Sequence, residues 1–512
     1  MRVRPQLSTR SKRITLLAVG ILAVTGCGTR LPDKDFALVQ TNGSQAPGAV
    51  ASSGPSSGPL AGGNAGQASG TNGTNGTAGH NVAGQGTKGT GGGGAGAGNL
   101  FAHACGPASS AGNKASDTGV SNNQIVIGNV SSRHNQFGSD QFIPNYFGLI
   151  AFVGHCNAVG GIHGRQIKLA PCDDQGNDAG NTSCINQMIS AHAFAMVANN
   201  MFSYPGAQTA YKAGLLDIGG EPIKGHPYYQ YNTMFNIYGD GYPKDGKNAG
   251  YQGHYWGTGE EAQFMKSQGI KKVGVVYYDQ QDSARGYAVI KAMFQDVGIP
   301  AAGHSVNLAD PNYQNAVVQM KQEGDDAVFD ALDSAGNQQL CQAMNSYHYL
   351  PKAKVSTIAA WTDHVGDDFA PPCRDIVWAA GKSASYNDTS VPMVNTFRQD
   401  FARYGQGETL SQWAVEGYIA GIWFAQAANS CGGDLTRSCV SHWLYAQKGL
   451  TAEGLMPADV NFIKKSYSTS KTERDCTEVV KWNQGKRGWD TLASIAHNCY
   501  TTRYYDYALD PA

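Results

Sequence analysis

The motif in this sequence that comes nearest to a cofactor site is Gly257-x-Gly259-x-x-Ala262. In a dinucleotide-binding turn such glycines follow a buried strand directly, so that the backbone can approach a pyrophosphate at a helix N-terminus. Residues 251–256 do not have the apolar, β-branched pattern of a buried strand. The sequence therefore predicts no nucleotide cofactor at this turn.

The other reactive residue types also lack the spacing of a catalytic or metal site. There is no strand–turn–helix elbow of the Gly-x-Ser-x-Gly type, which a serine hydrolase needs, and no Gly-x-x-x-x-Gly-Lys-Ser/Thr phosphate loop. The 13 histidines form no His-x-x-x-His pair, and the 11 cysteines form no Cys-x-x-Cys pair. We therefore expect no metal ion and no cofactor, and a binding protein rather than an enzyme.

The charge balance argues against a nucleic-acid partner. The chain of 512 residues carries 38 basic and 39 acidic side chains, whereas a nucleic-acid-binding protein presents a basic face.

A single hydrophobic core stops growing beyond about 250–300 residues, so we expect two lobes.

The elements that would position a binding site begin with a strand–helix–strand unit at residues 124–174. Residues 125–128 have the pattern of a short buried strand, and a helical pattern follows with Pro144 near its start. The glycine-rich run at 157–165 ends this helix, and a second apolar run at 166–170 follows. Such a βαβ unit places its binding crevice at the carboxyl ends of the strands.

The strand at 125–128, the turn Gly-Gly-Ile-His-Gly-Arg at 160–165 and the pair Asp173 and Asp174 resemble the type I periplasmic binding proteins. These are the solute receptors of branched-chain amino acid ABC transporters and their relatives. The resemblance runs from about Thr118 to near the C-terminus. It implies an α/β fold of two doubly wound, Rossmann-like lobes joined by a three-strand hinge. It also implies that a small molecule, such as an amino acid or a related amide or organic acid, is captured between the lobes and delivered to an ABC permease.

Alternating strand and helix patterns continue along the chain. Further strands are expected at 193–197, 215–220, 233–237, 272–279, 325–332, 355–360 and 376–380. Further helices are expected at 181–190, 259–268, 283–296, 338–347, 391–404 and 410–429. With the resemblance, this order assigns residues 117–240 and 383–455 to the first lobe and residues 241–382 and 456–512 to the second.

The resemblance also implies which residues bind the ligand, because relatives hold it at the strand ends of both lobes. The matching first-lobe residues are Ser131, Phe137, Asn199, Asn200, Ser203, Tyr204, Gly220 and Glu221. The matching second-lobe residues are Asp279, Ser283, Asp333, Ser334, Trp361, Thr362 and Asp363. Asp363 would neutralise an ammonium group, and Trp361 would stack on a flat or apolar ligand. A solvated loop carboxylate and a core tryptophan are the alternatives for these two residues.

The chain departs from the family pattern at residues 199–203. Relatives carry Gly-Pro and paired Ser or Thr there, whereas this chain has Asn-Asn-Met-Phe-Ser. The clamp for an amino-acid carboxylate is therefore not matched. Amino acids, amides, urea-like solutes and aromatic acids all stay open as ligands.

The N-terminal residues 1–27 resemble a lipoprotein signal peptide. A basic start precedes an apolar core at 14–24, which is shorter than the ~20 residues that span a membrane. Val-Thr-Gly-Cys follows at 24–27, so cleavage before Cys27 would leave that cysteine for lipid modification. We expect the protein on the extracytoplasmic face of the cell membrane, anchored by lipid.

Residues 28–116 are predicted to be a disordered tether rich in Gly, Ser and Ala. The stretch 41–99 has almost nothing to bury and cannot offset the entropy of ordering. Some sixty flexible residues reach roughly 40–45 Å on average, at ~5–6 Å × √n.

The cysteine count favours disulfides in an exported protein. With Cys27 assigned to the lipid anchor, ten cysteines remain, an even number. Plausible local pairs are Cys172 with Cys184, Cys341 with Cys373, Cys431 with Cys439 and Cys476 with Cys499, which leaves Cys105 with Cys156. The sequence does not fix this connectivity.

Partners follow from the resemblance. We expect a small-molecule ligand, an ABC permease and, through the anchor, the membrane; the protein itself is expected to be a monomer. Two alternatives stay open at this point. One is a sensor whose closure signals to a membrane partner, and the other is an extracellular enzyme on the same fold.

Overall fold

The computed structural model describes residues 104–106, 112–138, 140–221, 226–239, 241–247 and 253–508. The predicted signal peptide, Cys27 and almost all of the predicted tether lie outside these residues.

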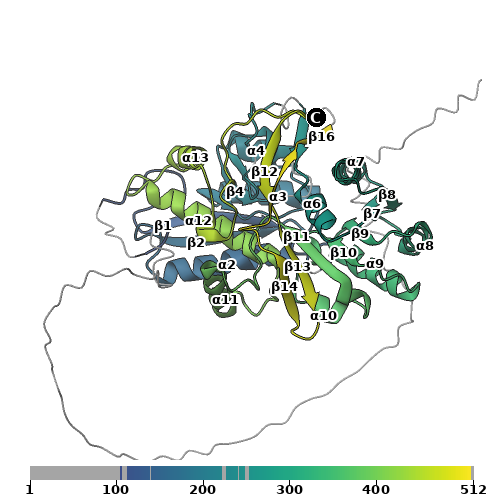
Figure 1. Ribbon diagram of the computed structural model, residues 1–512. Coiled ribbons are helices and arrows are strands. Elements are labelled where there is room, and N and C mark those ends of the chain that lie inside the picture. The colour runs from purple at the N-terminus through teal and green to yellow at the C-terminus, as the bar shows by residue number, and fades with distance from the viewer. Residues whose placement is uncertain are drawn as a thin grey trace, which may run out of the picture. The chain divides into compact units, whose positions relative to one another are not determined.

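The first lobe is built on a five-stranded parallel sheet (Figure 1). Its strands are β1 (Gln124–Ser131), β2 (Gln166–Asp173), β3 (Ala195–Val197), β4 (Leu216–Gly220) and β5 (Met234–Asn236). They lie in the order β2-β1-β3-β4-β5, which is a doubly wound order. The carboxyl ends of all five strands therefore lie at one edge of the sheet.

Helices cover both faces of this sheet. They are α2 (Ile143–Ala158), α3 (Asp178–Ser190), α4 (Ala207–Lys212), α5 (His226–Gln230), α11 (Pro392–Tyr404), α12 (Gln412–Ser430) and α13 (Arg437–Ala446). In β3, Ala195 and Val197 belong to the core under α2 and α12, whereas Met196 belongs to the core under α3 and α4. This alternation is the two-residue period of a strand that is buried on both faces.

Glycines let α2 and α12 pack in close contact (Figure 1). A Cβ at Gly148 of α2 would overlap the backbone carbonyl of Ala414, and one at Gly417 of α12 would overlap the carbonyl of Asn145. All but a few residues of α12 are buried. The apolar run that forms this helix is therefore the centre of the first lobe.

The second lobe repeats the same order in a larger sheet. Its strands are β7 (Val273–Tyr278), β8 (Ala301–Val306), β9 (Ala327–Ala331), β10 (Ala353–Ser356), β11 (Val377–Gly381), β13 (Glu478–Asn483) and β14 (Gly488–Ala493). The order is β8-β7-β9-β10-β11 with parallel pairing, and β13 and β14 are added antiparallel beside β11 (Figure 1). Its helices are α6 (Glu260–Ser267), α7 (Gln281–Asp296), α8 (Tyr313–Glu323), α9 (Ser334–Ser346) and α10 (Val365–Asp368).

The chain passes between the lobes three times. The first crossing segment joins β5 to α6, the second joins β11 to α11, and the third joins α13 to β13. Short strands strengthen these segments: β6 (His254–Gly257) pairs with β16 (Tyr505–Ala508), and β12 (Thr472–Cys476) pairs with β15 (Cys499–Arg503). The three-strand hinge implied by the sequence is therefore present.

Five disulfides are formed in the described residues. They join Cys105 to Cys156, Cys172 to Cys184, Cys341 to Cys373, Cys431 to Cys439 and Cys476 to Cys499. Four of these pairs are the ones that local spacing made plausible, and Cys105 with Cys156 is the pair that these four left over.

The structure corrects and extends the predicted elements. Residues 358–360 are not part of a strand, because β10 ends at Ser356 and Ile358–Ala360 forms a short 3-10 turn (η2). The elements β8, α8, α13 and all the strands after residue 470 were not predicted.

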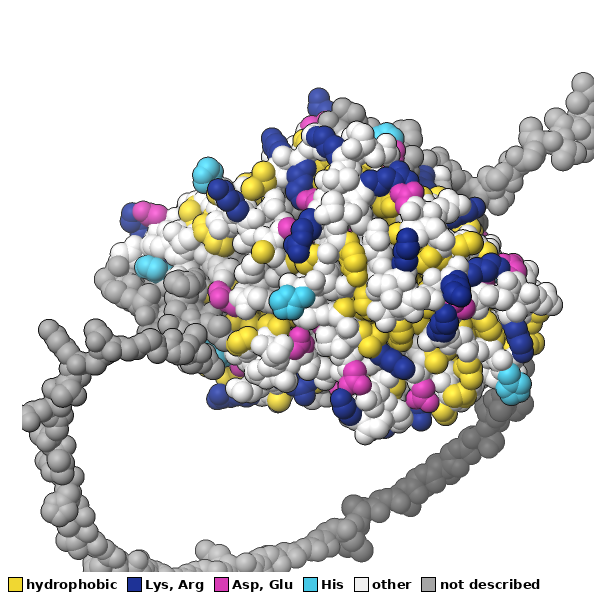
Figure 2. All heavy atoms as spheres, in the orientation of Figure 1, with side chains coloured by type: hydrophobic (Ala, Val, Ile, Leu, Met, Phe, Trp, Pro, Cys, Tyr) yellow, Lys and Arg dark blue, Asp and Glu magenta, His cyan; other side chains and the backbone are white. Residues whose placement is uncertain are grey.

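Basic and acidic side chains are interspersed over the face shown in Figure 2, as the charge balance suggests. None of the helices in the described part of the chain is both long and apolar enough to cross a membrane.

Candidate ligand-binding site

The two lobes touch through the loop that follows β1. The backbone N–H of Ala335, in the first turn of α9, donates to the carbonyl oxygen of Phe137 at 3.1 Å. In the same loop, Asp140 pairs with His364 of the second lobe at 2.6 Å. Phe137 is buried and stacks on Phe202 at 4.6 Å. The structure thus brings the predicted residue Phe137 to the interface between the lobes.

Ser131 and Asn200 lie side by side at the carboxyl ends of β1 and β3, where their backbones form a bridge. The Ser131 hydroxyl donates to the side chain of Asn129 at 3.1 Å. Asn200 is fully buried, yet neither Nδ2 nor Oδ1 of its amide has a hydrogen-bond partner. Because an unpaired buried amide costs free energy, Asn200 has the unused bonding capacity that a ligand contact requires.

Three other predicted residues bond inside the first lobe. The Asn199 amide donates to Asp217 at 2.8 Å and the Tyr204 hydroxyl donates to the same carboxylate at 2.9 Å. Burial raises the pKa of Asp217 to about 6. The Ser203 hydroxyl donates to Asp178. These side chains hold the strand ends together, and a ligand contact for them stays a prediction.

The second-lobe strand ends are also tied internally. Asp333 is the N-cap of α9, and its carboxylate accepts the hydroxyl of Tyr278 at 2.8 Å. The Ser334 hydroxyl donates to a carbonyl oxygen of η2 at 3.0 Å. Asp279 is exposed and accepts from the loop after β8, and Ser283 is half-buried in the first turn of α7. A ligand contact for these four residues stays a prediction.

Trp361, Thr362 and Asp363 join the second lobe to the segment before α12. Thr362 forms a backbone bridge with Ser411, and the Asp363 carboxylate accepts the hydroxyl of Tyr386 at 2.9 Å. Burial raises the pKa of Asp363. Trp361 is fully buried and its Nε1 has no hydrogen-bond partner. The alternative of a core tryptophan under the interface fits this burial.

Glu221 follows β4 and belongs to a buried pair of carboxyl groups. The Tyr238 hydroxyl donates to Glu221 at 2.6 Å and lies 3.5 Å from both oxygens of Glu416 in α12. Burial raises the pKa of both carboxyl groups. The predicted residue Gly220 is needed next to them, because a Cβ there would overlap the hydroxyl of Tyr228. In the described part of the chain, Glu221 Oε2 has no hydrogen-bond partner besides the carboxyl group of Glu416.

A cavity of about 460 Å³ lies beside Glu221. Strand ends of both sheets line it: Glu221 and Tyr238 follow β4 and β5, Thr357 follows β10, and Ala380 and Gly381 end β11. Residues of all three crossing segments complete the wall. The volume falls within the range of small-molecule sites. Of the predicted ligand contacts, Glu221 is the one that lines this cavity.

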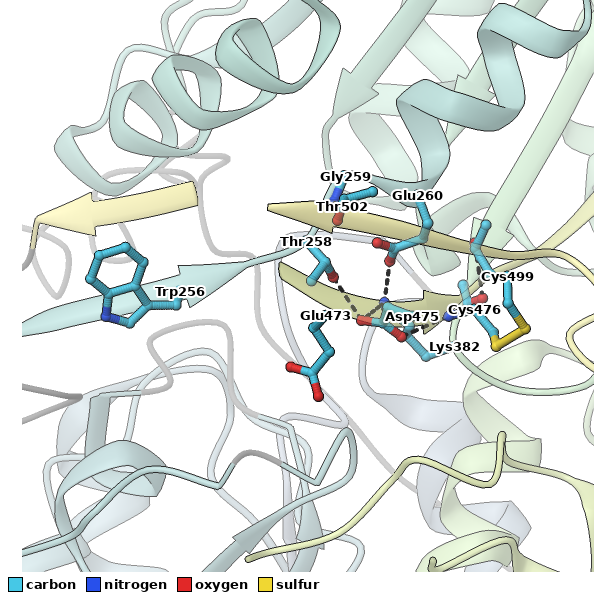
Figure 3. A network of polar contacts seen from close by, with 12 residues as sticks. Trp256, Thr258, Gly259, Glu260, Lys382, Glu473, Asp475, Cys476, Cys499 and Thr502 are labelled. Atoms are coloured by element: carbon cyan, nitrogen blue, oxygen red, sulfur yellow. Dashed lines mark hydrogen bonds and ion pairs between the residues drawn. A yellow bond between two sulfur atoms is a disulfide. The ribbon is translucent and has the colours of Figure 1, made fainter. Parts of the chain in front are cut away.

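Lys382 of the second crossing segment forms ion pairs with residues of the first and third crossing segments (Figure 3). Its ammonium group pairs with Glu260 and, at 2.6 Å, with Asp475 of β12. The Thr258 hydroxyl donates to the same Asp475 oxygen at 2.6 Å. Burial lowers the pKa of Lys382, but the surrounding carboxylates outweigh it and raise this pKa. The three crossing segments therefore meet at one charged lysine in the cavity wall.

Comparison with known proteins identifies the fold and the family. Residues 100–486 match the family model described as periplasmic binding protein. The chain belongs to the periplasmic binding protein family. A sequence search of curated proteins finds no match to this chain.

Solved structures of the family confirm the type I fold. A leucine-binding protein, LivK, of Thermotoga maritima is 12% identical with a TM-score of 0.55, over 72% of this chain and 98% of that one. A branched-chain amino acid transporter binding protein, LivJ, of Streptococcus pneumoniae in complex with isoleucine is 15% identical with a TM-score of 0.53, over 74% and 99%. A fatty acid ABC transporter substrate-binding protein of Thermomonospora curvata is 14% identical with a TM-score of 0.55, over 78% and 96%.

The cavity of this periplasmic binding protein is lined mainly by residues that the sequence did not single out. Tyr238, Trp256, Glu260, Lys382 and Asp475 come from segments that only the fold brings together. The sequence contains one indication of this cavity, namely the turn at 257–262, which resembles a nucleotide-binding motif. Its glycines instead lead from β6 into α6, where Glu260 enters the cavity wall.

Two groups of side chains in the described residues have the spacing of metal ligands. They are Asp140, His364 and Asp368, and His304, Glu323 and Asp325. In the first group His364 pairs with Asp140, and in the second Lys272 pairs with Asp325 at 3.1 Å. A histidine ring and an ammonium group therefore already face these carboxylates.

Proposed function

We propose that this protein is an extracytoplasmic solute-binding lipoprotein that captures a small molecule between its lobes and delivers it to an ABC permease. The observation that carries the proposal is the cavity of about 460 Å³, because strand ends of both sheets and all three crossing segments line it. A ligand there would contact both lobes at once. Two of the solved structures named above are described as substrate-binding proteins of transporters.

Capture would work by a shift between open and closed arrangements of the lobes. The contacts that join the lobes include the hydrogen bond from Ala335 to Phe137 and the pair of His364 with Asp140. The backbone bridge between Thr362 and Ser411 joins the lobes as well. A ligand that touches both lobes favours the closed arrangement by its difference in affinity, for which a few kcal/mol is enough. No covalent step is needed, which agrees with a binding protein rather than an enzyme.

The anchor and the lobe boundaries are part of the same proposal. Lipid attached to Cys27 would hold the protein at the outer face of the membrane, with residues 28–116 as the tether. The end of this stretch is fixed to the first lobe by the disulfide of Cys105 with Cys156 and by the hydrogen bond that Asn113 donates to the carbonyl oxygen of His163. The first lobe would consist of residues 117–240 and 383–455, and the second of residues 241–382 and 456–512. Labelling of cells with a radioactive fatty acid tests the anchor: wild type is expected to incorporate label, and Cys27→Ala is not.

A solute screen tests binding. The soluble chain from residue 104 onwards is mixed with amino acids, amides, organic acids and amines, and its unfolding temperature is followed. A ligand raises this temperature, and small-angle X-ray scattering then shows whether the radius of gyration falls on binding. Asp363→Ala and Trp361→Ala on any hit test the predicted second-lobe contacts. A hit that binds both variants like wild type would remove those two residues from the site.

Delivery needs its own experiment. The loaded protein is added to liposomes that contain an ABC permease of the same organism, and ATP hydrolysis and solute uptake are measured. Stimulation of both supports transport. Binding with closure but without stimulation would favour a sensor, and chemical conversion of the solute would favour an enzyme.

A further inference from the structure

The cavity beside Glu221 has a strong excess of acidic side chains. Its lining includes six carboxyl groups and two ammonium groups, and no arginine or histidine among the described residues. The acidic residues are Glu221, Glu260, Glu261, Asp459, Glu473 and Asp475. An anionic ligand would have to enter against this charge.

Neither lysine in the wall is available for a ligand carboxylate. Lys382 is held by Glu260 and Asp475 (Figure 3). Lys465 pairs with Glu473 at 2.5 Å, while its backbone N–H donates to the carbonyl oxygen of Gly241. A ligand carboxylate would have to break one of these ion pairs, which leaves a carboxylate of the protein unpaired.

Several carboxyl oxygens of the wall, in contrast, lack a donor. Glu260 is 1% exposed, and its Oε2 has no hydrogen-bond partner, although Oε1 faces Lys382. Among the described residues, Asp459 Oδ1 is also buried and unpartnered, and Glu221 Oε2 has no partner besides the neighbouring carboxyl group of Glu416. Each such oxygen costs free energy that an N–H donor from a ligand would recover.

The remaining wall is largely aromatic. Tyr238, Tyr255, Trp256, Tyr467 and Tyr504 line the same cavity. Ring faces attract ammonium groups and also pack against the methylene groups of an alkylamine. The wall therefore combines hydrogen-bond acceptors of negative charge with surfaces that suit a short apolar chain.

We propose that this cavity takes an organic ammonium ion that carries N–H donors and no carboxylate, such as an alkylamine or a diamine. The proposal rests on the proposed function, because it names the solute class for the same site. It separates this chain from the neighbours whose described ligands, isoleucine and fatty acid, both carry a carboxylate.

The protonation of the wall agrees with the proposal. Burial raises the pKa of Glu260, and the nearby carboxylates of Glu261 and Asp475 add to this effect against the attraction of Lys382. Burial also raises the pKa of Glu221. Part of the wall therefore holds protons near neutral pH, and an ammonium ion that binds to these carboxyl groups is expected to release them.

The test is isothermal titration calorimetry on the chain from residue 104 onwards. The probes are n-pentylamine, 1,5-diaminopentane, tetramethylammonium, leucine and hexanoate. At least one of the two amines is expected to bind, while leucine and hexanoate are not. Tetramethylammonium lacks N–H donors and should bind at least about 10-fold more weakly than the better amine.

Variants locate the amine. Glu260→Gln removes the charge that faces Lys382, and Glu221→Gln removes the other acceptor without touching the Lys382 ion pairs. Each is expected to weaken amine binding about 10- to 100-fold, as for the loss of a charge-assisted hydrogen bond. Asp310→Asn, an exposed carboxylate outside the cavity, is the matched control and should bind like wild type. If Glu260→Gln does not fold, the affinity of Glu221→Gln for the amine alone tests the inference.

The outcomes separate the two proposals. If leucine or hexanoate binds with lobe closure and neither amine does, the solute class is wrong and the proposed function stands. If an amine binds but both Gln variants bind it like wild type, the amine does not occupy this cavity and the inference fails. If no member of a broad solute screen binds, both proposals fail.

Discussion

Glu478 offers a prediction whose size follows from the structure. This residue begins β13, and its side chain is fully buried. The backbone N–H of Ile495 donates to Oε2, and the backbone of Ser385 and the side chain of Thr491 also lie close to the carboxyl group. Burial raises the pKa of Glu478 from the ordinary value of 4.5 to about 8, and Asp388 adds to this effect.

The direction of the pKa shift decides in which pH range Glu478 stabilises the folded state. A carboxyl group whose pKa is higher in the folded state binds its proton more tightly there, so folding is favoured at low pH. This stability is present in full below pH 4.5 and is lost as the pH rises to about 8. At ~1.4 kcal/mol per unit, the loss is at most about 5 kcal/mol.

Glu478→Gln removes this loss, because the amide has no proton to lose. The free energy of unfolding is measured from urea titrations at pH 5, 7 and 9, followed by the fluorescence of Trp482 and Trp489, which face each other across β13 and β14. The variant-minus-wild-type difference is expected to grow by up to about 5 kcal/mol between pH 5 and pH 9.

Glu323→Gln is the control, because Glu323 is exposed and its ion pair with Lys272 at 3.5 Å lies on the surface. The difference in free energy of unfolding between Glu323→Gln and wild type should change by less than about 1 kcal/mol over the same pH range. Parallel pH profiles for wild type and Glu478→Gln would refute the reasoning, since Glu478 would then ionise inside the fold without cost.

Three further predictions concern packing, a buried ion pair and the contact between the lobes. Lys354 and Asp330 are both fully buried and paired at 2.8 Å. Lys354→Ala should therefore lower the free energy of unfolding by about 3–5 kcal/mol. As a control, Lys486→Ala at an exposed ion pair should change this free energy by less than about 1 kcal/mol. Gly148→Ala should destabilise the protein by more than about 2 kcal/mol in a thermal or urea melt, because the new methyl group overlaps the carbonyl of Ala414; Gly286→Ala, where space is open inside α7, should be neutral or stabilising. The hydrogen bond to Asp140 raises the pKa of His364, with Asp368 and Glu408 also nearby, so this contact between the lobes is favoured below pH 6.5 and weakens above it. Scattering at pH 5.5 and 8.5 should show a larger increase in the radius of gyration for wild type than for His364→Ala, and equal changes would contradict this.

Much of the fold could be predicted because its parallel strands are buried and rich in β-branched residues. The strands β1 and β7 have such runs, and both were expected within a few residues of their bounds. The strand β8 was missed because its residues, Ala-Ala-Gly-His-Ser-Val, include a glycine and a histidine and few branched side chains. The strand β12 carries charges between its less exposed residues. The strands β13 and β16 pair with β11 and β6, which lie far away along the chain, although β13 also pairs with β14 and β12 with β15 inside the tail.

The site was harder to predict because hydrogen-bond partners cannot be read from strand ends alone. Asn199 and Asn200 are neighbours in sequence, yet one amide is bonded to Asp217 and the other has no partner. The carboxylates that face Lys382 are 122 and 93 residues away from it. No local pattern joins residues at such separations, so the acidic cavity emerged only from the way the crossing segments meet.

The pairing of β16 with β6 couples one wall of the cavity to a distant part of the chain. β6 contributes Trp256 to the cavity, and its backbone partner β16 is the segment Tyr505–Ala508. Removal of β16 would leave the strands of both sheets in place but would take away the partner that holds β6 beside the cavity. A short ribbon outside both sheets therefore shapes the space in which a small molecule would lie.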